Sequence, residues 1–426
     1  MYRYLTMVAL LLSSVVYGQD KGFVQVKDLG FEINSEPYHY IGTNLWYGMN
    51  LGSKGDQGDR ERLVRELDAL QALGVTNLRV MAASEGSLDS PYQNKPILQT
   101  APGVYDEDLL EGLDFFMVEM AKRDMKAVVC LGNFWMWSGG FPQYVSWATG
   151  SEIPYPDVTG GGSWDEFISY SESFYTNKKA MKMYYDFVEF LIGRTNSLTG
   201  VAYEDDPTIM AWQLANEPRG YSHVPEFRAW IDKSAKLIKK KDQNHLVCLG
   251  TEGDTSTPIS GNELYADNLS KYVDYATTHV WIQNWGWFDP NDTLSFETAK
   301  QMTLDYLKGQ EEKAQRLGKP LVVEEFGVPR DGGAFGDEST VVYRDAYYRL
   351  IFDYTLRSIQ SDGVIQGCNF WSWGGEGRPS APGQLWEIGD DLIGDPAHEL
   401  QGWYSVYDTD TSTVDLIKEF TLQVEE

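Results

Sequence analysis

Short apolar runs alternate with longer amphipathic stretches from about residue 38 to the end of the chain. Eight of the runs have the length of buried strands, and six of the stretches carry apolar residues at helical spacing. This alternation predicts a parallel sheet, and eight repeats predict closure into a (β/α)8 barrel of the TIM type, an α/β fold. A doubly wound open sheet is the alternative, but no glycine fingerprint for a dinucleotide follows the first strand. The predicted strands are 40–45, 76–81, 127–132, 209–216, 246–250, 276–280, 321–326 and 365–371, and the predicted helices are 60–73, 108–123, 178–194, 226–240, 296–317 and 343–360.

The connecting segments differ in length at the two ends of the predicted barrel. Helix-to-strand connections are short, as at 73–75 and 361–363, whereas strand-to-helix connections are long, as at 82–107, 133–177 and 372–396. The long loops therefore all lie at the carboxyl ends of the strands, where they predict the walls of a cleft. Residues 22–38 predict a short hairpin that caps the opposite end. We expect a single catalytic domain over residues 19–426.

The first eighteen residues have the pattern of an export signal. Arg3 supplies a basic start, residues 5–16 are apolar, and residues 16–18 place small side chains at the usual cleavage offsets. A membrane anchor is the alternative, but the apolar run is short for a bilayer span. We therefore expect a signal peptide over residues 1–18 and a secreted protein, extracellular or periplasmic, that has no contact with the membrane after cleavage.

The amino-acid composition argues against some classes of protein and favours others. The 35 Lys and Arg against 63 Asp and Glu give a net charge of −28, which argues against nucleic acid as a partner. Cys130, Cys248 and Cys368 lie in apolar runs, where cysteines act as small core side chains, so a disulfide framework receives little weight. Many of the 14 Trp fall in predicted loops, which suits a cleft that stacks on sugar rings, although core packing accounts for most aromatics. We expect no cofactor, no metal and a monomer.

Two predicted strands end in carboxylates. In the segment TIMAWQLANEPRG (208–220), alternation puts Gln213 and Glu217 on an inner face and Met210 and Trp212 on an outer face that meets helices. The strand 321–326 ends in Glu324 and Glu325, and alternation lets only one of these two point into the barrel mouth, without deciding which. Two carboxylates at strand ends of one barrel are the groups that glycoside hydrolysis uses. One protonates the leaving oxygen, while the other attacks the anomeric carbon or activates water.

Asn216-Glu217-Pro218 and Glu325-Phe326-Gly327 resemble the signature of glycoside hydrolase family 5, whose members are retaining enzymes built on this barrel. The resemblance implies that Glu217 is the acid/base and that Glu325, not Glu324, is the nucleophile. It also implies that Arg79, in the segment TNLR (76–79), supports the nucleophile, and that His279 is the active-site histidine after the sixth strand.

Further motifs resemble the endo-β-mannanase branch of this family. The resemblance implies that Arg219 lies towards the leaving group, that Trp135 in NFWMWSGG (133–140) offers a platform for sugar, and that Trp371 in NFWSW (369–373) lies beneath the sugar at the cleavage point. One departure concerns Trp281. Many members carry a Tyr at that position that bonds to the nucleophile, whereas indole can donate but cannot accept, so the role of Trp281 stays open.

The sequence favours a secreted retaining endo-β-1,4-mannanase that acts on mannan, glucomannan or galactomannan. We expect Glu217 to start as the acid, with its pKa raised by the neighbouring negative charge. An exo-acting β-mannosidase or a β-1,4-glucanase on the same barrel is the alternative, because loop walls and one hydroxyl contact decide between them. A glycan-binding protein that has lost catalysis is a third hypothesis, although both acids are present.

Overall fold

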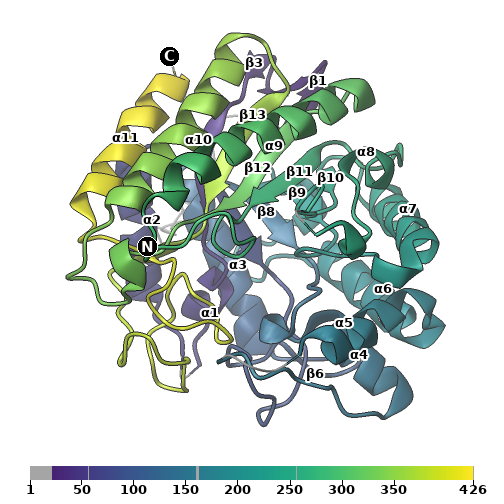
Figure 1. Cartoon of the computed structure of the whole chain (residues 1–426). Coiled ribbons are helices and arrows are strands. Elements are labelled where there is room, and N and C mark those ends of the chain that lie inside the picture. Colours follow the sequence, from purple (N-terminus) through teal and green to yellow (C-terminus); the bar gives the residue numbers. More distant parts are fainter. Residues whose placement is uncertain (1–21, 56, 160–162, 256, 426) are drawn as a thin grey trace, which may run out of the picture.

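The computed structural model describes residues 22–55, 57–159, 163–255 and 257–425. Eight parallel strands form one sheet in the order β10-β9-β8-β5-β4-β13-β12-β11, and a bridge between Cys248 and Tyr275 joins its two ends. The predicted (β/α)8 barrel is therefore confirmed, and Figure 1 shows its helices around the strands. The strands are β4 (Tyr40–Asn44), β5 (Asn77–Met81), β8 (Lys126–Cys130), β9 (Ile209–Gln213), β10 (Leu246–Cys248), β11 (Ala276–Val280), β12 (Leu321–Phe326) and β13 (Ile365–Phe370).

Amphipathic helices cover the outside of the barrel. Three of them begin at residues whose side chains accept a hydrogen bond from the first turn, namely Asp59, Asp106 and Asn177. All six predicted helices are present, and the structure adds a last helix, α11 (Thr411–Glu425), which the sequence analysis missed. The major helices are α2 (Arg60–Ala72), α3 (Glu107–Lys122), α6 (Lys178–Ile192), α7 (Val224–Lys241), α9 (Ser295–Leu317) and α10 (Val342–Gln360). None of the helices in the described ranges is long and apolar enough to span a membrane.

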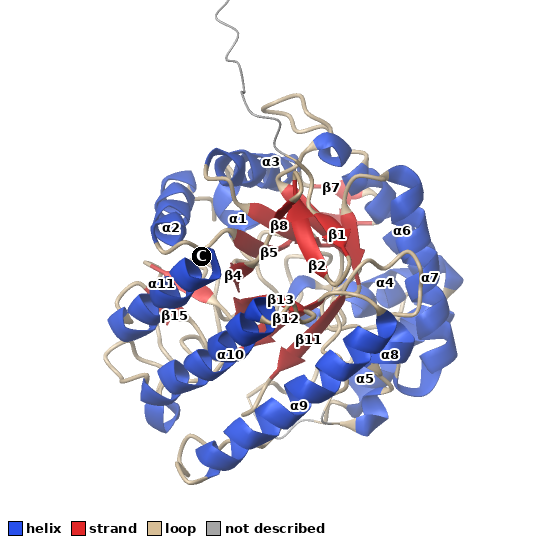
Figure 2. Ribbon diagram, turned by 90° about the horizontal axis from the view of Figure 1, so that it is seen from above, coloured by secondary structure: helices blue, strands red, loops and turns tan. Residues whose placement is uncertain are grey.

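The amino-terminal end of the barrel is closed by a small antiparallel sheet. Strands β1 (Gln25–Lys27), β2 (Gly30–Ile33) and β3 (Glu36–Pro37) confirm the predicted hairpin, and Figure 2 shows β1 and β2 across this end. Phe31 packs with Tyr40 and Met210 in an apolar cluster at the bottom of the barrel. The outer-face prediction for Met210 is wrong, because the register between β8 and β9 shifts by one residue there. Trp212 does pack against the helices, as predicted.

The longest loops lie at the carboxyl ends of the strands, and the loop over residues 376–405 crosses this end. On one side, its Gly394 carbonyl accepts a hydrogen bond from Trp46 Nε1 (2.8 Å), and its Ala397 amide donates to Asn94 Oδ1 (3.0 Å) in the loop after β5. On the other side, the Tyr404 hydroxyl donates to Asn284 in the loop after β11. The loop is thus tied to opposite sides of the barrel mouth.

A buried ion cluster fixes the end of this loop to the barrel wall. Asp410 accepts hydrogen bonds from Arg330 Nη2 with both carboxylate oxygens (2.8 and 2.8 Å) and from Arg344 Nη1 with one (3.1 Å). Both arginines are fully buried. Arg344 also donates to the Ser405 carbonyl at the loop's end, so that one carboxylate joins the segment after β12, helix α10 and the segment before α11.

We predict that Asp410→Ala lowers the free energy of unfolding by about 3–5 kcal/mol, because two buried guanidinium groups lose their anion. The measurement is urea denaturation followed by tryptophan fluorescence. Glu419→Ala serves as the control, since Glu419 pairs with Arg349 where both side chains are about half exposed; we expect it to cost less than about 1 kcal/mol. Equal losses in the two variants would contradict the role given to the buried cluster.

Candidate active site

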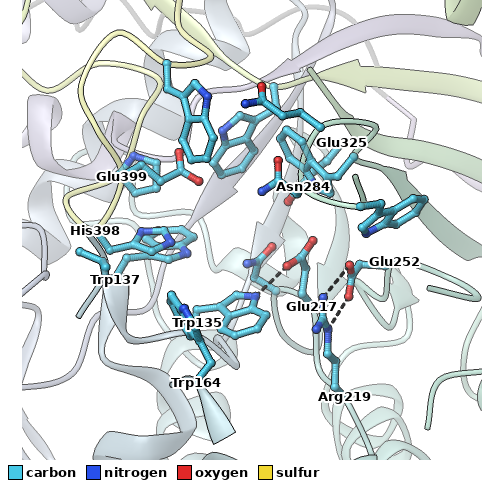
Figure 3. A pocket seen from close by; sticks show the side chains of 18 of the residues that line it. Trp135, Trp137, Trp164, Glu217, Arg219, Glu252, Asn284, Glu325, His398 and Glu399 are labelled. Atoms are coloured by element: carbon cyan, nitrogen blue, oxygen red, sulfur yellow. Dashed lines mark hydrogen bonds and ion pairs between the residues drawn. The ribbon is translucent and has the colours of Figure 1, made fainter. Parts of the chain in front are cut away.

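A pocket of about 520 Å³ opens at the carboxyl ends of the barrel strands. Loops after seven different elements contribute to it, and aromatic side chains make up much of its wall, as Figure 3 shows. Seven of the nine residues predicted for the site line it: Trp135, Asn216, Glu217, Arg219, Trp281, Glu325 and Trp371. The other two, Arg79 and His279, lie buried directly behind Glu217 and Glu325.

Glu217 reaches the pocket by a turn of the backbone and not by strand alternation. Strand β9 ends at Gln213, four residues earlier, and Glu217 has φ +47°, which is uncommon for a residue with a side chain. Its backbone amide donates to the Gly250 carbonyl at 2.9 Å, which holds the turn. The neighbouring side chain of Asn216 is fixed at the same level by Arg79 Nη2, which donates to Asn216 Oδ1 at 2.7 Å.

Glu325 is held by the guanidinium of Arg79. Arg79 Nη1 donates to Glu325 Oε1 and to Asn44 Oδ1, while its Nη2 donates to Asn216 and its Nε to Gln213. Arg79 is 4% exposed, and its ion pairs raise its pKa further above the ordinary range. The expected support of the candidate nucleophile by Arg79 is therefore present in the geometry.

Only Glu325 of the two lines the pocket at the barrel mouth, as expected, but alternation does not keep the Glu324 side chain out of the barrel interior. Thr278 pairs with Val323 and His279 pairs with Glu325, so Glu324 is an extra residue in β12 opposite β11. Such a bulge breaks the alternation of faces. Glu324 lies deeper than Glu325: it is 1% exposed, and Gln213 Nε2 donates to its Oε2 at 2.6 Å.

His279 connects the two candidate catalytic carboxylates. Its Nδ1 lies 2.8 Å from Glu217 Oε1 and 3.3 Å from Glu325 Oε2. Oxygen atoms of the two carboxylates lie within 4.8 Å of each other. This spacing fits the approximately 5–5.5 Å of retaining glycosidases and is shorter than the approximately 6.5–9.5 Å of inverting ones.

Burial and the neighbouring charges shift the pKa values of this trio. Burial favours a raised pKa for Glu217, but the hydrogen bond and charge of His279, with the charge of Arg219, lower the pKa to about 2. Burial raises the pKa of Glu325 to about 7. Burial opposes the protonation of His279, yet the carboxylates around it raise its pKa to about 10. The direction for Glu217 is opposite to our expectation, because the proton that the carboxylates share resides on His279.

Arg219 and Trp135 fix the outer side of Glu217. Trp135 Nε1 donates to Glu217 Oε2 at 2.7 Å, and the Arg219 guanidinium lies over the Trp135 ring at 4.9 Å. Arg219 also makes a bidentate ion pair with Glu252 (2.6 and 2.8 Å), drawn in Figure 3. Trp135 therefore orients the candidate acid/base through its ring N–H, in addition to any contact with sugar.

Trp281 packs edge-on against Trp371 (6.1 Å between ring centroids) and against Tyr404 (5.0 Å). Among the hydrogen bonds of the described residues, none joins Trp281 to Glu325, so Arg79 and His279 are the groups that hold this carboxylate. The indole of Trp281 therefore forms part of the pocket wall.

The sequence analysis missed several residues of the pocket. Trp137 stands inside the motif NFWMWSGG (133–140), and Glu252 follows the predicted strand 246–250 directly, so their places in the sequence point to the pocket. Asn284, His398, Glu399 and Trp403 come from long loops without periodicity. No signal in the sequence marks these four.

One group of acidic and histidine side chains in the described part of the chain could in principle hold a metal ion, namely Glu217, His279 and Glu325. The charges around it do not favour a cation. The guanidinium of Arg79 contacts Glu325, and the raised pKa of His279 keeps its imidazole protonated. A protonated imidazole has no lone pair for a metal.

An (β/α)8 barrel with two carboxylates at retaining distance in an aromatic pocket defines a glycoside hydrolase. The chain belongs to glycoside hydrolase family 5: a family model described as β-mannosidase-like within that family matches residues 21–426. The resemblance seen in the sequence is thereby confirmed.

Individual relatives carry both mannosidase and mannanase names. The crystal structure of a family 5 mannosidase from Rhizomucor miehei is 38% identical, with a TM-score of 0.87 over 96% of this chain and 99% of that one. An endo-1,4-β-D-mannanase structure from Thermotoga petrophila is 26% identical, with a TM-score of 0.69 over 90% of this chain and 99% of that one. Mannan endo-1,4-β-mannosidase 1 of Solanum lycopersicum is 29% identical over 85% of this chain and 86% of its own length.

We predict that Glu325→Gln abolishes activity and stabilises the fold in a pH-dependent way. A carboxyl group with a raised pKa contributes stability below its unfolded pKa of about 4.5, and this contribution is lost as the pH rises through about 7. Glutamine cannot ionise, so the variant gains up to about 3 kcal/mol over the wild type across this interval. The measurement is the free energy of unfolding at pH 4.5, 6 and 8.

Glu312→Gln is the control for this experiment, because Glu312 is exposed on α9. We expect its difference from the wild type to stay constant over the same pH values. A constant difference for Glu325→Gln as well would show that the charge of Glu325 is not the destabilising feature.

Proposed function

We propose that the protein is a secreted, retaining, exo-acting β-mannosidase that removes single mannosyl units from the non-reducing ends of β-linked manno-oligosaccharides. The family and its mannosidase-named and mannanase-named relatives support a mannoside as substrate. The apolar pattern of residues 1–18, which lie outside the described residues, supports secretion. The exo mode rests on the shape of the pocket.

Glu325 is the proposed nucleophile, and Glu217 the proposed acid/base. Glu325 attacks the anomeric carbon as the bond to the leaving oxygen breaks, and Glu217 gives that oxygen a proton. His279 Nδ1, 2.8 Å from Glu217, supplies this proton to Glu217, and it is the one that the trio shares, so its transfer to the leaving oxygen leaves Glu217 ionised and His279 neutral. Glu217 then takes a proton from the water that hydrolyses the glycosyl-enzyme, and Arg79 binds the carboxylate of Glu325 when it is released.

The single observation that carries the exo mode is the closure of one end of the pocket by the loop over residues 376–405. The proposed proton donor Glu217 and the pair Arg219–Glu252 lie on one side, and Figure 3 shows Trp137, His398 and Glu399 on the other. The leaving group lies on the side of the proton donor, so the closed side receives the glycone. Hydrogen bonds to Trp46 and Asn94 hold the loop against the β4 and β5 sides of the mouth. We infer that the loop leaves room for one sugar on the glycone side.

His398 and Glu399 are suited to bind the hydroxyl groups of that terminal sugar. Both are partly buried, and His398 Nδ1 and Glu399 Oε2 are buried atoms without a hydrogen-bond partner in the described chain. Burial lowers the pKa of His398 to about 4. Burial and the charge of Asp395 raise the pKa of Glu399 well above the ordinary value. His398 is thus neutral near pH 7, and the raised pKa of Glu399 favours its protonated form; in these forms both groups can exchange hydrogen bonds with neutral hydroxyls.

Endo-mannanase activity, which the sequence favoured, remains the second candidate function. Its support is the name of relatives such as mannan endo-1,4-β-mannosidase 1 of Solanum lycopersicum, 29% identical to this chain. An endo mode requires a cleft that continues past the glycone sugar, which is where the loop over residues 376–405 lies. The two modes give different products from one substrate.

The deciding experiment is a time course on mannohexaose whose reducing end has been reduced with borohydride. We expect mannose and the reduced pentasaccharide as the first products, and no rapid loss of viscosity from soluble linear mannan. Reduced disaccharides and trisaccharides at the earliest times, with a fall in viscosity, would establish the endo mode. Cleavage of cello-oligosaccharides at a comparable rate would overturn the choice of mannose.

We predict that Glu399→Ala raises KM for an aryl β-mannoside by about ten- to a hundredfold, since a lost hydrogen bond to a buried group costs about 1–3 kcal/mol. Glu399→Gln should come within a few fold of the wild type, because an amide can donate as the protonated carboxyl does. Glu387→Ala, at an exposed position of the same loop, is the control and should leave KM unchanged. A large effect of the glutamine variant together with a small effect of the alanine variant would contradict this recognition.

A further inference from the structure

The bulge in β12 brings a third carboxylate into the interior beneath the catalytic pair. Glu324 is the extra residue between the pairs Thr278–Val323 and His279–Glu325. Its side chain is 1% exposed and does not belong to the wall of the pocket. Glu324 therefore cannot contact substrate, and any effect that it has on the reaction must pass through its neighbours.

The neighbours of Glu324 are the two cations that hold the catalytic carboxylates. Its Oε2 lies 3.6 Å from Arg79 Nε and 3.9 Å from His279 Nε2. Each of these cations presents its other side to Glu325: Arg79 through Nη1 and His279 through Nδ1. Glu324 thus stands behind both cations, opposite the reacting groups.

Gln213 adds a second connection between Glu324 and Arg79. Its Nε2 donates to Glu324 Oε2 at 2.6 Å, and its Oε1 accepts from Arg79 Nε at 2.8 Å. Because an ionised carboxylate can only accept, the amide group must turn its NH2 towards Glu324 and its oxygen towards Arg79. The donor and the acceptor are therefore fixed at each hydrogen bond from Glu324 through Gln213 and Arg79 to Glu325.

We propose that Glu324 is a positioning residue, whose buried negative charge keeps His279 protonated and, through Gln213, keeps Arg79 oriented towards Glu325. Because of the bulge, strand β12 supplies both the proposed nucleophile, Glu325, and the charge of Glu324 behind it. The inference rests on the roles proposed above for Glu217 and Glu325, but not on the exo mode.

The environment of Glu324 includes other ionisable groups, which bear on its effect on the pKa of His279. The proton on His279 is favoured by four carboxylates, namely Glu217, Glu252, Glu324 and Glu325, whereas Arg79 opposes it. The groups that face this cluster from the surrounding strands and their ends are Tyr40 (β4), Arg79 (β5), Cys130 (β8), Cys248 (β10), Tyr275 (next to β11), His279 (β11) and Glu325 (β12), with Glu217 beyond β9 and Glu252 beyond β10. Burial keeps the tyrosines and cysteines neutral, since it raises their pKa values. Glu324 is therefore one of four carboxylates that set the charge of His279.

The test compares the wild type with Glu324→Gln, which keeps the shape of the side chain and removes its charge. Selective labelling of histidine for NMR titration reads the pKa of His279 directly among the 5 histidines. We expect this pKa to fall by about one unit or more. On an aryl β-mannoside and on linear mannan, we expect kcat to fall at least about tenfold, with KM changed less than about threefold. The alkaline limb of the pH profile of activity should shift to lower pH together with the pKa of His279.

Glu66→Gln is the matched control, because Glu66 is also a buried carboxylate beside an arginine, Arg62, but lies outside the wall of the pocket. It should lower the melting temperature and leave the pH profile unchanged. Glu324→Asp retains the charge and should return the pKa of His279 towards the wild-type value. An unchanged pKa of His279 in Glu324→Gln, or a loss of activity matched by Glu66→Gln, would overturn the proposal. Full activity of Glu325→Gln would instead refute the catalytic roles proposed for Glu217 and Glu325. The NMR titration of His279 would still test the role of Glu324.

Discussion

The structure depends on keeping two cations, Arg79 and His279, buried at the open end of the barrel among three carboxylates. An unpaired buried charge is costly, and a buried ion pair is favourable only when its remaining polar atoms are also bonded. Here Asn44 at the end of β4, and Gln213 and Asn216 at and just after the end of β9, bond to Arg79. Removing either cation leaves the carboxylates with uncompensated charge, which explains why these strand ends must carry specific polar residues.

This cluster also separates the chemistry from the choice of substrate. The groups proposed to make and break bonds stand at strand ends and are fixed by the barrel, whereas His398, Glu399 and Trp403 belong to one loop. The loop has little regular structure and is held instead by side chains: the buried carboxylate of Asp395 accepts hydrogen bonds from the amides of Gly402 and Tyr404 (2.9 and 2.6 Å). A change in this loop can open or close the glycone side without disturbing the catalytic pair, so mannosidases and mannanases can share one family.

The sequence predicted the fold because hydrophobic periodicity reports burial, and every strand of a barrel is buried on both faces. It also identified residues that the structure does bring together, since carboxyl ends of parallel strands meet at one end. It failed where the backbone departs from regular geometry. Alternation could not reveal the bulge at Glu324, nor the left-handed turn at Glu217, because both depend on pairing with neighbouring strands. Nor could it find His398, whose position is fixed by contacts from elsewhere in the chain.

The location of the proton follows from the same arrangement and bears on how the two steps of retaining hydrolysis can alternate. In the free enzyme, Glu217 and Glu325 both face His279 Nδ1, and two carboxylates so close to each other favour one shared proton. On the proposed roles, formation of the glycosyl-enzyme turns Glu325 into a neutral ester. The charge that favoured the shared proton is then gone, and the proton itself has departed with the leaving group, so that Glu217 is ionised, as a base must be. Hydrolysis restores the charge of Glu325 and with it the affinity for the proton. The acid and base states of Glu217 are therefore set in turn by the covalent state of Glu325.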